Sequence, residues 1–112
     1  IVTEAAEQCA RTALPVVSAP QKLEAILAGW PDDRRLYFAD EMGGEPAERT
    51  FAKASGPAAM LIGPEGGFDD AEREMLRAHA KVQPITLGPR VLRGETAAIA
   101  ATALWMAVSG DW

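Results

Sequence analysis

The sequence is poor in several residue types that mark particular classes of protein. Its 112 residues include one cysteine, Cys9, so no internal disulfide can form, and a reducing cytoplasm is the expected setting. The only histidine is His79, and we expect no metal site. No apolar run approaches membrane-spanning length and no signal-peptide pattern occurs, so we expect no membrane partner.

Positive charge is scarce as well. The 11 Lys and Arg side chains against 16 Asp and Glu give a formal net charge of −5 at pH 7. A large nonspecific nucleic-acid surface needs clustered Lys and Arg, which displace counterions from phosphates, so any RNA contact must be local. The length and the 48% hydrophobic content suit one compact core. We predict a single domain over residues 1–112 and interpret it as part of a longer chain.

Glycine, by contrast, is concentrated in one stretch around which the chain is organised. Residues 58–62 form a short apolar run bounded by Pro57 and Gly63, which suits a buried parallel strand. Asp69 and Glu72 then have the spacing of a capping box, so a helix is expected directly after the turn. The local order is strand, turn, helix.

The turn itself has the composition of a ligand-facing loop. The turn contains Gly63, Gly66 and Gly67. Because glycine has no Cβ, the backbone at these positions can adopt positive φ, and a flat ligand can approach it closely. A tight turn needs fewer glycines, so three of them at the carboxyl end of a strand, around Pro64-Glu65, favour a binding site. No Gly-Lys-Ser/Thr follows and the spacing is not Gly-x-Gly-x-x-Gly, which argues against a phosphate loop.

Hydrophobic periodicity predicts the remaining elements. We expect helices over residues 1–13, 21–28, 71–80 and 96–109, strands over 36–39 and 82–87, and a connection over 45–56 with a helical turn around 46–54. The first helix is expected to pack its apolar face inward, and the charges of the 71–80 helix to face solvent. His79 should interact with the end of its helix. Alanines in the last helix indicate a close neighbour, either the chain's own backbone or a second subunit.

Two loops together carry a resemblance to a known family. The segments 61–68 (LIGPEGGF) and 87–97 (LGPRVLRGETA) closely resemble the bacterial ribosomal RNA small subunit methyltransferase E family, which belongs to the SPOUT methyltransferases. The opening segment, AEQCART at 6–12 followed by Pro15, is similar to a helix motif of that family. The resemblance covers essentially the whole chain.

The resemblance implies an α/β fold with a mostly parallel sheet flanked by helices and a deep trefoil knot at its C-terminus. It implies methyl transfer from S-adenosylmethionine to N3 of a uridine in 16S ribosomal RNA of the small subunit, by a cytoplasmic homodimer. The family also has an N-terminal RNA-binding β-barrel and a first part of the methyltransferase domain, and we expect both to lie outside this sequence. Gly94 stands where family members usually have threonine.

Matching motif positions also imply site residues. The cofactor would be enclosed by the end of the 36–39 strand and by both glycine loops, at Ala39, Ile62, Gly63, Pro64, Glu65, Gly66, Gly67, Leu87, Gly88, Arg90, Val91, Leu92 and Thr96. For catalysis, Glu95 is the expected base or orienting acceptor for uridine N3, and Arg93 or Arg11 would stabilise charge on the uracil oxygens. An acidic residue is also simply favoured at a helix N-terminus, which is an equal explanation of Glu95.

Two other functions stay open on the sequence. The chain is also consistent with a cofactor-binding and dimerisation module that cannot hold ribosomal RNA by itself. A nucleotide-binding α/β domain without methyl transfer is a third possibility, which the glycine loops favour and the missing phosphate-loop lysine disfavours.

Overall fold

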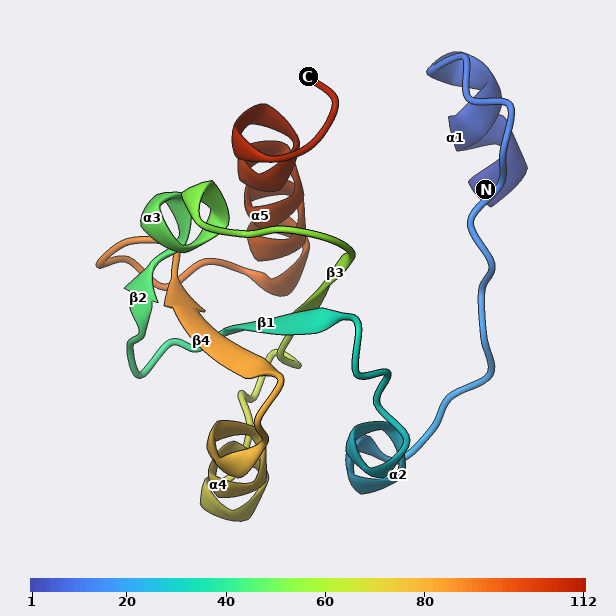
Figure 1. Cartoon of the computed structure of the whole chain (residues 1–112). Coiled ribbons are helices and arrows are strands. Elements are labelled where there is room, and N and C mark those ends of the chain that lie inside the picture. Colours follow the sequence, from blue (N-terminus) through green and yellow to red (C-terminus); the bar gives the residue numbers. More distant parts are fainter.

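The computed structural model describes residues 1–112 and contains five helices and four strands (Figure 1). In chain order these are α1 (Val2–Gln8), α2 (Leu23–Ala28), β1 (Arg35–Ala39), β2 (Glu45–Pro46), α3 (Ala47–Ala52), β3 (Ala58–Ile62), α4 (Asp70–Ala78), β4 (Val82–Thr86) and α5 (Gly94–Val108). No helix has both the length and the hydropathy needed to cross a bilayer.

The strands form one parallel sheet in the order β2-β4-β1-β3. The central strand β1 pairs with β3 and with β4, so Phe38 lies opposite Leu61 on one side and Pro84 on the other. This confirms the predicted α/β class with a parallel sheet flanked by helices. The two-residue strand β2 was not predicted, because a segment that short has no periodicity. β3 is an edge strand whose five residues are only half-buried, so the expectation of a buried strand is wrong there.

Different helices cover the two faces of the sheet (Figure 1). Successive side chains of β1 point to opposite faces. Leu36 and Phe38 point to one face and pack in a cluster with Leu27 of α2 and Leu76 of α4. This cluster fixes α4, the helix that follows the glycine turn, against the centre of the sheet.

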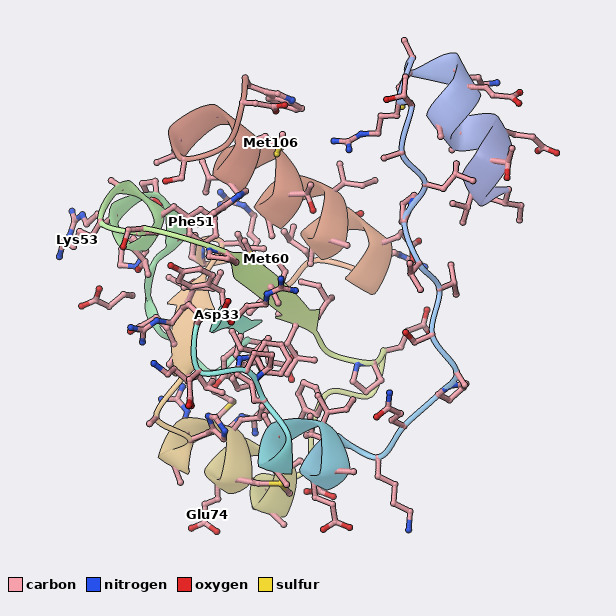
Figure 2. The ribbon with its side chains drawn as sticks, turned by 45° about the vertical axis from the view of Figure 1, so that its right-hand side comes forward. Asp33, Phe51, Lys53, Met60, Glu74 and Met106 are labelled. Carbon is pink, nitrogen blue, oxygen red and sulfur yellow. The ribbon has the colours of Figure 1, made fainter.

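The opposite face of β1 presents Tyr37, which packs with Phe51 of α3 and Ile85 of β4. Its ring meets Phe51 edge-on at 5.0 Å between centroids. Met60 and Trp105 pack against the same cluster, and Figure 2 shows Met60 and Phe51 on this side of the sheet. α5 lies over α3 and β3, so the close neighbour expected for its alanines belongs to the same chain.

The first helix differs most from its prediction. α1 ends at Gln8, whereas a helix over residues 1–13 was predicted. In Figures 1 and 2 it stands apart from the sheet and the other helices. Only Ala6 is buried in it, so its apolar face does not pack inward as expected. Residues 11–20 are exposed without exception. A single turn or two of helix has too little apolar surface to hold itself against a core across such a linker.

Local signals set the ends of the other helices well. The capping box of α4 is confirmed, since Asp69 Oδ1 accepts from the Glu72 N–H at 2.7 Å and Glu72 Oε1 accepts from the Asp69 N–H at 3.0 Å. α5 begins at Gly94, two residues before its predicted start. At the end of α4, the His79 Nδ1 accepts from the Lys81 N–H, so Nε2 carries the proton and donates to the Leu27 carbonyl at 3.0 Å. His79 therefore ties α4 to α2, beyond the expected interaction with its own helix end.

Candidate functional site

A cavity of about 450 Å³ opens at the edge of the sheet where β1, β3 and β4 end. Its walls are three segments that follow those strands, at residues 39–41, 62–68 and 86–94, with Arg73 of α4 and Ala97 of α5 completing it. The carboxyl edge of a parallel sheet is where open α/β folds bind ligands, and this volume lies in the usual range for small-molecule sites.

The wall after β1 is built on a buried carboxylate. The Asp40 side chain has no exposed surface, and its Oδ2 accepts from Arg77 Nε at 3.1 Å and Nη2 at 2.6 Å. Its Oδ1 accepts from Arg73 Nε at 3.2 Å and from the Met42 N–H at 2.9 Å. Arg77 Nη2 also donates to the Gly43 carbonyl at 2.7 Å. Two arginines of α4 thereby hold the segment after β1 in one position.

This arrangement corrects the expectation that the charges of α4 face solvent. Arg73 and Arg77 both reach inward to Asp40, and the Arg73 side chain is only 17% exposed. Burial by itself raises the pKa of the Asp40 carboxyl, but the Met42 N–H bond, the Arg77 bond and the two guanidinium charges outweigh it. The net result is a pKa of Asp40 below its usual value, so the carboxylate is ionised at neutral pH.

The turn after β3 uses its glycines to admit neighbouring side chains. A Cβ at Gly63 would lie 3.1 Å from the ring of Phe68, and a Cβ at Gly67 would lie 2.8 Å from Glu41 Oε1. Gly67 has φ +74° and its N–H donates to the Pro64 carbonyl at 2.9 Å, which closes the turn. The missing Cβ atoms therefore first serve packing within the chain, where the sequence had indicated room for a ligand.

The wall after β4 is held by its own side chain. Thr86 Oγ1 donates to the Gly88 carbonyl at 3.1 Å and accepts from the Gly88 N–H at 3.2 Å, with Gly88 at φ +114°. Beyond this turn Val91 is 79% exposed although it lines the cavity. The loop then reaches Arg93, the N-cap of α5, so the first turn of that helix begins beside the cavity.

The structure brings most of the predicted site residues together. Those that line the cavity are Ala39, Ile62, Gly63, Pro64, Glu65, Gly67, Leu87, Gly88, Arg90, Val91, Leu92 and Arg93. Four predicted residues are outside its lining: Gly66 at the tip of the turn, Glu95 and Thr96 in the first turn of α5, and Arg11 in the exposed segment after α1. All four are exposed.

Sequence reasoning missed other residues of the lining. These are Asp40, Glu41, Phe68, Arg73, Thr86, Pro89, Gly94 and Ala97. Asp40 and Glu41 directly follow a predicted strand, and polar residues at that position were a usable signal. Arg73 had none, because its partner Asp40 lies 33 positions earlier in the chain.

The lining suits a small ligand with both apolar and charged parts. Ile62, Leu87 and Leu92 supply apolar surface, glycines expose backbone, and both carboxylates and guanidinium groups face the space. S-adenosylmethionine combines a flat base, a sugar and a zwitterionic amino acid with a sulfonium, so the residues present fit it. No group of three or more His, Cys, Asp and Glu side chains is placed to hold a metal ion.

Comparison with protein families gives a match over residues 1–106 to a family described as RNA methyltransferase domain. The chain is 32% identical over 107 residues to a ribosomal RNA small subunit methyltransferase E from Rickettsia conorii, covering 91% of this chain and 42% of the relative. It is 38% identical over 109 residues to the protein of that name from Synechocystis, covering 92% and 35%. The chain therefore spans less than half the length of these curated relatives.

A solved structure has the same fold. The ribosomal RNA small subunit methyltransferase E from Neisseria gonorrhoeae, crystallised bound to S-adenosyl methionine, superposes with a TM-score of 0.84 at 29% identity. The match covers 99% of this chain and 46% of that one.

Proposed function

We propose, from the premise that this chain belongs to the RNA methyltransferase domain family, that it binds S-adenosylmethionine and methylates ribosomal RNA. The resemblance to the ribosomal RNA small subunit methyltransferase E family is confirmed by relatives at 32% and 38% identity. The observation that carries the proposal is that both family-like loops and the end of β1 line one and the same cavity, at the ligand-binding edge of the sheet. A relative of the same fold was crystallised with this cofactor.

We assign the substrate as a uridine of 16S ribosomal RNA, methylated at N3. The names of the relatives support small-subunit ribosomal RNA, and the family resemblance supports the position. When bound, S-adenosylmethionine supplies an electrophilic methyl group on sulfur. The protein must align the uracil N3 with that methyl group and accept the N3 proton, so positioning is the main part of its work.

Within the chain, Arg93 is the proposed catalytic cation. It lines the cavity at the start of α5, where a guanidinium can stabilise negative charge on a uracil oxygen as N3 loses its proton. Glu95 is two residues further and exposed, so we place the proton acceptor at the cavity mouth, on the side from which RNA approaches. We also propose Thr96 and Gly66, which are exposed and outside the cavity lining, as outer cofactor contacts.

Arg11 is the proposed contribution of a second subunit. It lies in the exposed segment after α1, which stands apart from the body of the chain (Figure 1), and it does not line the cavity of its own chain. A homodimer in which this segment reaches the partner's cavity mouth would bring Arg11 to the site. We also propose the family's trefoil knot, one methyltransferase domain over residues 1–112, and a cytoplasmic location beside the small ribosomal subunit.

The alternative is a cofactor-binding and dimerisation module that does not methylate RNA by itself. The net charge of −5 favours it, because few cations are available to hold RNA. The fact that the chain spans 35% to 42% of its curated relatives favours it as well. A nucleotide-binding domain without methyl transfer is disfavoured by the sequence and separable by titration with S-adenosylhomocysteine against ATP.

Two assays test the proposal. Calorimetric titration of the 112-residue chain with S-adenosylmethionine, with its mass measured alongside, should give one site per chain in a dimer. Transfer of a radioactive methyl group to 16S ribosomal RNA in small subunits should follow, and mapping should place it on uridine N3. Cofactor binding without transfer would support the module. Binding of ATP but not of S-adenosylhomocysteine would refute the cofactor assignment.

The catalytic roles need variants in a protein that transfers methyl groups. Glu95→Gln should lower kcat by about a hundredfold or more with the KM for S-adenosylmethionine unchanged, which is the scale of general base catalysis. Gln8→Ala, an exposed position at the end of α1, is the control for Arg11→Ala. Full methylation by Glu95→Gln would show that the base is another group.

A further inference from the structure

The cavity contains a row of three charged side chains whose contacts the sequence did not indicate. It runs from Asp40 through Arg73 to Glu41. Arg73 Nε is 3.2 Å from Asp40 Oδ1, and Arg73 Nη2 is 4.0 Å from Glu41 Oε1. All three residues line the cavity. Asp40 has no exposed side-chain surface, whereas the Glu41 side chain is 49% exposed. The row of charges therefore extends from the interior to a carboxylate that a ligand can reach.

Glu41 is held in place from two sides. Its Oε1 lies 2.8 Å from the position that a Cβ of Gly67 would occupy, so the carboxylate rests directly over the glycine turn. Gly67 has φ +74°, a backbone conformation that residues with a side chain rarely adopt. The absence of a Cβ at this position leaves room for the Glu41 carboxylate. Arg73 bounds the carboxylate on the other side. A polar group fixed in this way is prepared for hydrogen bonding before the ligand arrives.

The charges around Glu41 indicate which kind of group it receives. Asp40 and Glu41 are compensated by Arg73 and Arg77, so the cluster sums to zero. Asp70 adds a carboxylate 4.0 Å from Arg73 Nη1, but its side chain is fully exposed and screened by water. A compensated carboxylate has no surplus charge to attract a cation, yet it keeps its acceptor lone pairs. Two neighbouring neutral donors suit it best.

We propose that Glu41 binds the vicinal hydroxyl groups of the ribose of S-adenosylmethionine, and that Arg73, fixed by Asp40, positions it. This inference rests on the proposed function, since it names the contact that the same cavity makes with the sugar. Glu41 is a cofactor-binding residue, and Arg73 and Asp40 are positioning residues that act through it.

The contact with Glu41 is tested by calorimetry with three ligands and the variant Glu41→Gln. S-adenosylhomocysteine and methylthioadenosine both have the ribose hydroxyls, but only the first has the amino acid part. We expect Glu41→Gln to weaken both by the same factor, about ten- to a hundredfold, as for a lost hydrogen bond to a charged group. A loss for S-adenosylhomocysteine alone would overturn the proposal in favour of an ammonium contact.

The third ligand, the 2′-deoxy form of methylthioadenosine, identifies the hydroxyl. It should bind the unaltered protein more weakly than methylthioadenosine does, and Glu41→Gln should remove most of that difference. The matched control is Glu74→Gln, an equal change at the neighbour of Arg73 on α4. The Glu74 side chain is exposed and points outward (Figure 2). A 2′-deoxy penalty that persists in Glu41→Gln would overturn the assignment.

The positioning role is tested by a double-mutant cycle. Arg73→Met should weaken methylthioadenosine about as much as Glu41→Gln does, and the double variant should be no weaker than Glu41→Gln alone. Arg73→Lys should restore part of the binding. Additive losses would mean that Arg73 contacts the ligand directly. Failure of the unaltered chain to bind any of the three ligands refutes the proposed function itself, whereas binding unaffected by Glu41→Gln refutes this inference alone.

Discussion

Asp40→Asn removes a negative charge from a carboxyl group that has no exposed surface and leaves two guanidinium groups facing a neutral amide. The carboxylate accepts only, whereas the amide has an N–H₂ group on one side. If Nδ2 replaces Oδ2, it faces the Arg77 donors. If it replaces Oδ1, it faces Arg73 Nε and the Met42 N–H. In either orientation donors meet donors, so the substitution cannot preserve the network.

The expected loss of stability follows from these contacts. In the more favourable orientation the amide Nδ2 replaces Oδ2, and the two charge-assisted hydrogen bonds from Arg77 are lost. Each such bond is worth roughly 1.5–3 kcal/mol when fully desolvated. The Arg77 side chain is 43% exposed, so water compensates part of the loss. We therefore expect the free energy of unfolding to fall by about 2–3 kcal/mol. For a chain of this size that corresponds to a melting temperature lower by about 10 °C.

The pH dependence gives a second, independent signature. The pKa of Asp40 is lowered in the folded state, so its contribution to stability is fully present above the unfolded pKa of about 3.9. It is lost as the pH falls through the lower folded value. The stability gap between the unaltered protein and Asp40→Asn should therefore be constant from neutral pH down to about pH 5 and should narrow below about pH 4.

Urea unfolding followed by circular dichroism, at several pH values, measures this gap. Asp70→Asn is the matched control, because that carboxylate is fully exposed and 4.0 Å from the same Arg73, and it should leave the stability essentially unchanged. Equal stability of Asp40→Asn and Asp70→Asn at neutral pH would refute the reasoning. So would a gap that stays unchanged through the acid range.

Two glycine positions give further predictions by thermal unfolding. Gly44→Ala should lower the free energy of unfolding by at least about 2 kcal/mol, because its Cβ would lie 2.7 Å from the Ile85 nitrogen in the neighbouring strand β4. Gly66→Ala, whose Cβ would have nothing within 4 Å, should lower it by less than about 0.5 kcal/mol. Equal stabilities would show that β2 shifts freely. Gly94→Thr should fold with stability equal or higher by a few tenths of a kcal/mol and retain S-adenosylmethionine binding, since its Cβ would meet only the Gly63 carbonyl at 3.7 Å. A folded variant that no longer binds the cofactor would show that the space at Gly94 belongs to the ligand.

Much of the fold could be predicted because its signals are local. The apolar runs at 36–39 and 58–62 and the capping residues Asp69 and Glu72 each depend on neighbours within a few positions. The cavity lining was largely predictable for the same reason, since carboxyl ends of parallel strands meet at one edge. The family motifs then located both glycine loops.

What was missed depends on partners that are distant in the chain. The inward direction of Arg73 and Arg77 is decided by Asp40, 33 and 37 positions earlier. In the sequence these arginines look like any solvated pair on an amphipathic helix. Gly63 and Gly67 similarly make room for Phe68 and Glu41, which only the folded chain places beside them.

By itself the sequence determined most of the helices and strands, the capping box of α4 and the glycine turns, because backbone preferences and hydrophobic periodicity act between near neighbours. Only the tertiary structure decided the strand order, the half-buried edge position of β3, the detachment of α1 and the pairing of Asp40 with α4. These features depend on contacts between segments that are far apart in the sequence. A buried charge needs a paired partner, and only the fold determines which oppositely charged side chain lies within hydrogen-bonding distance.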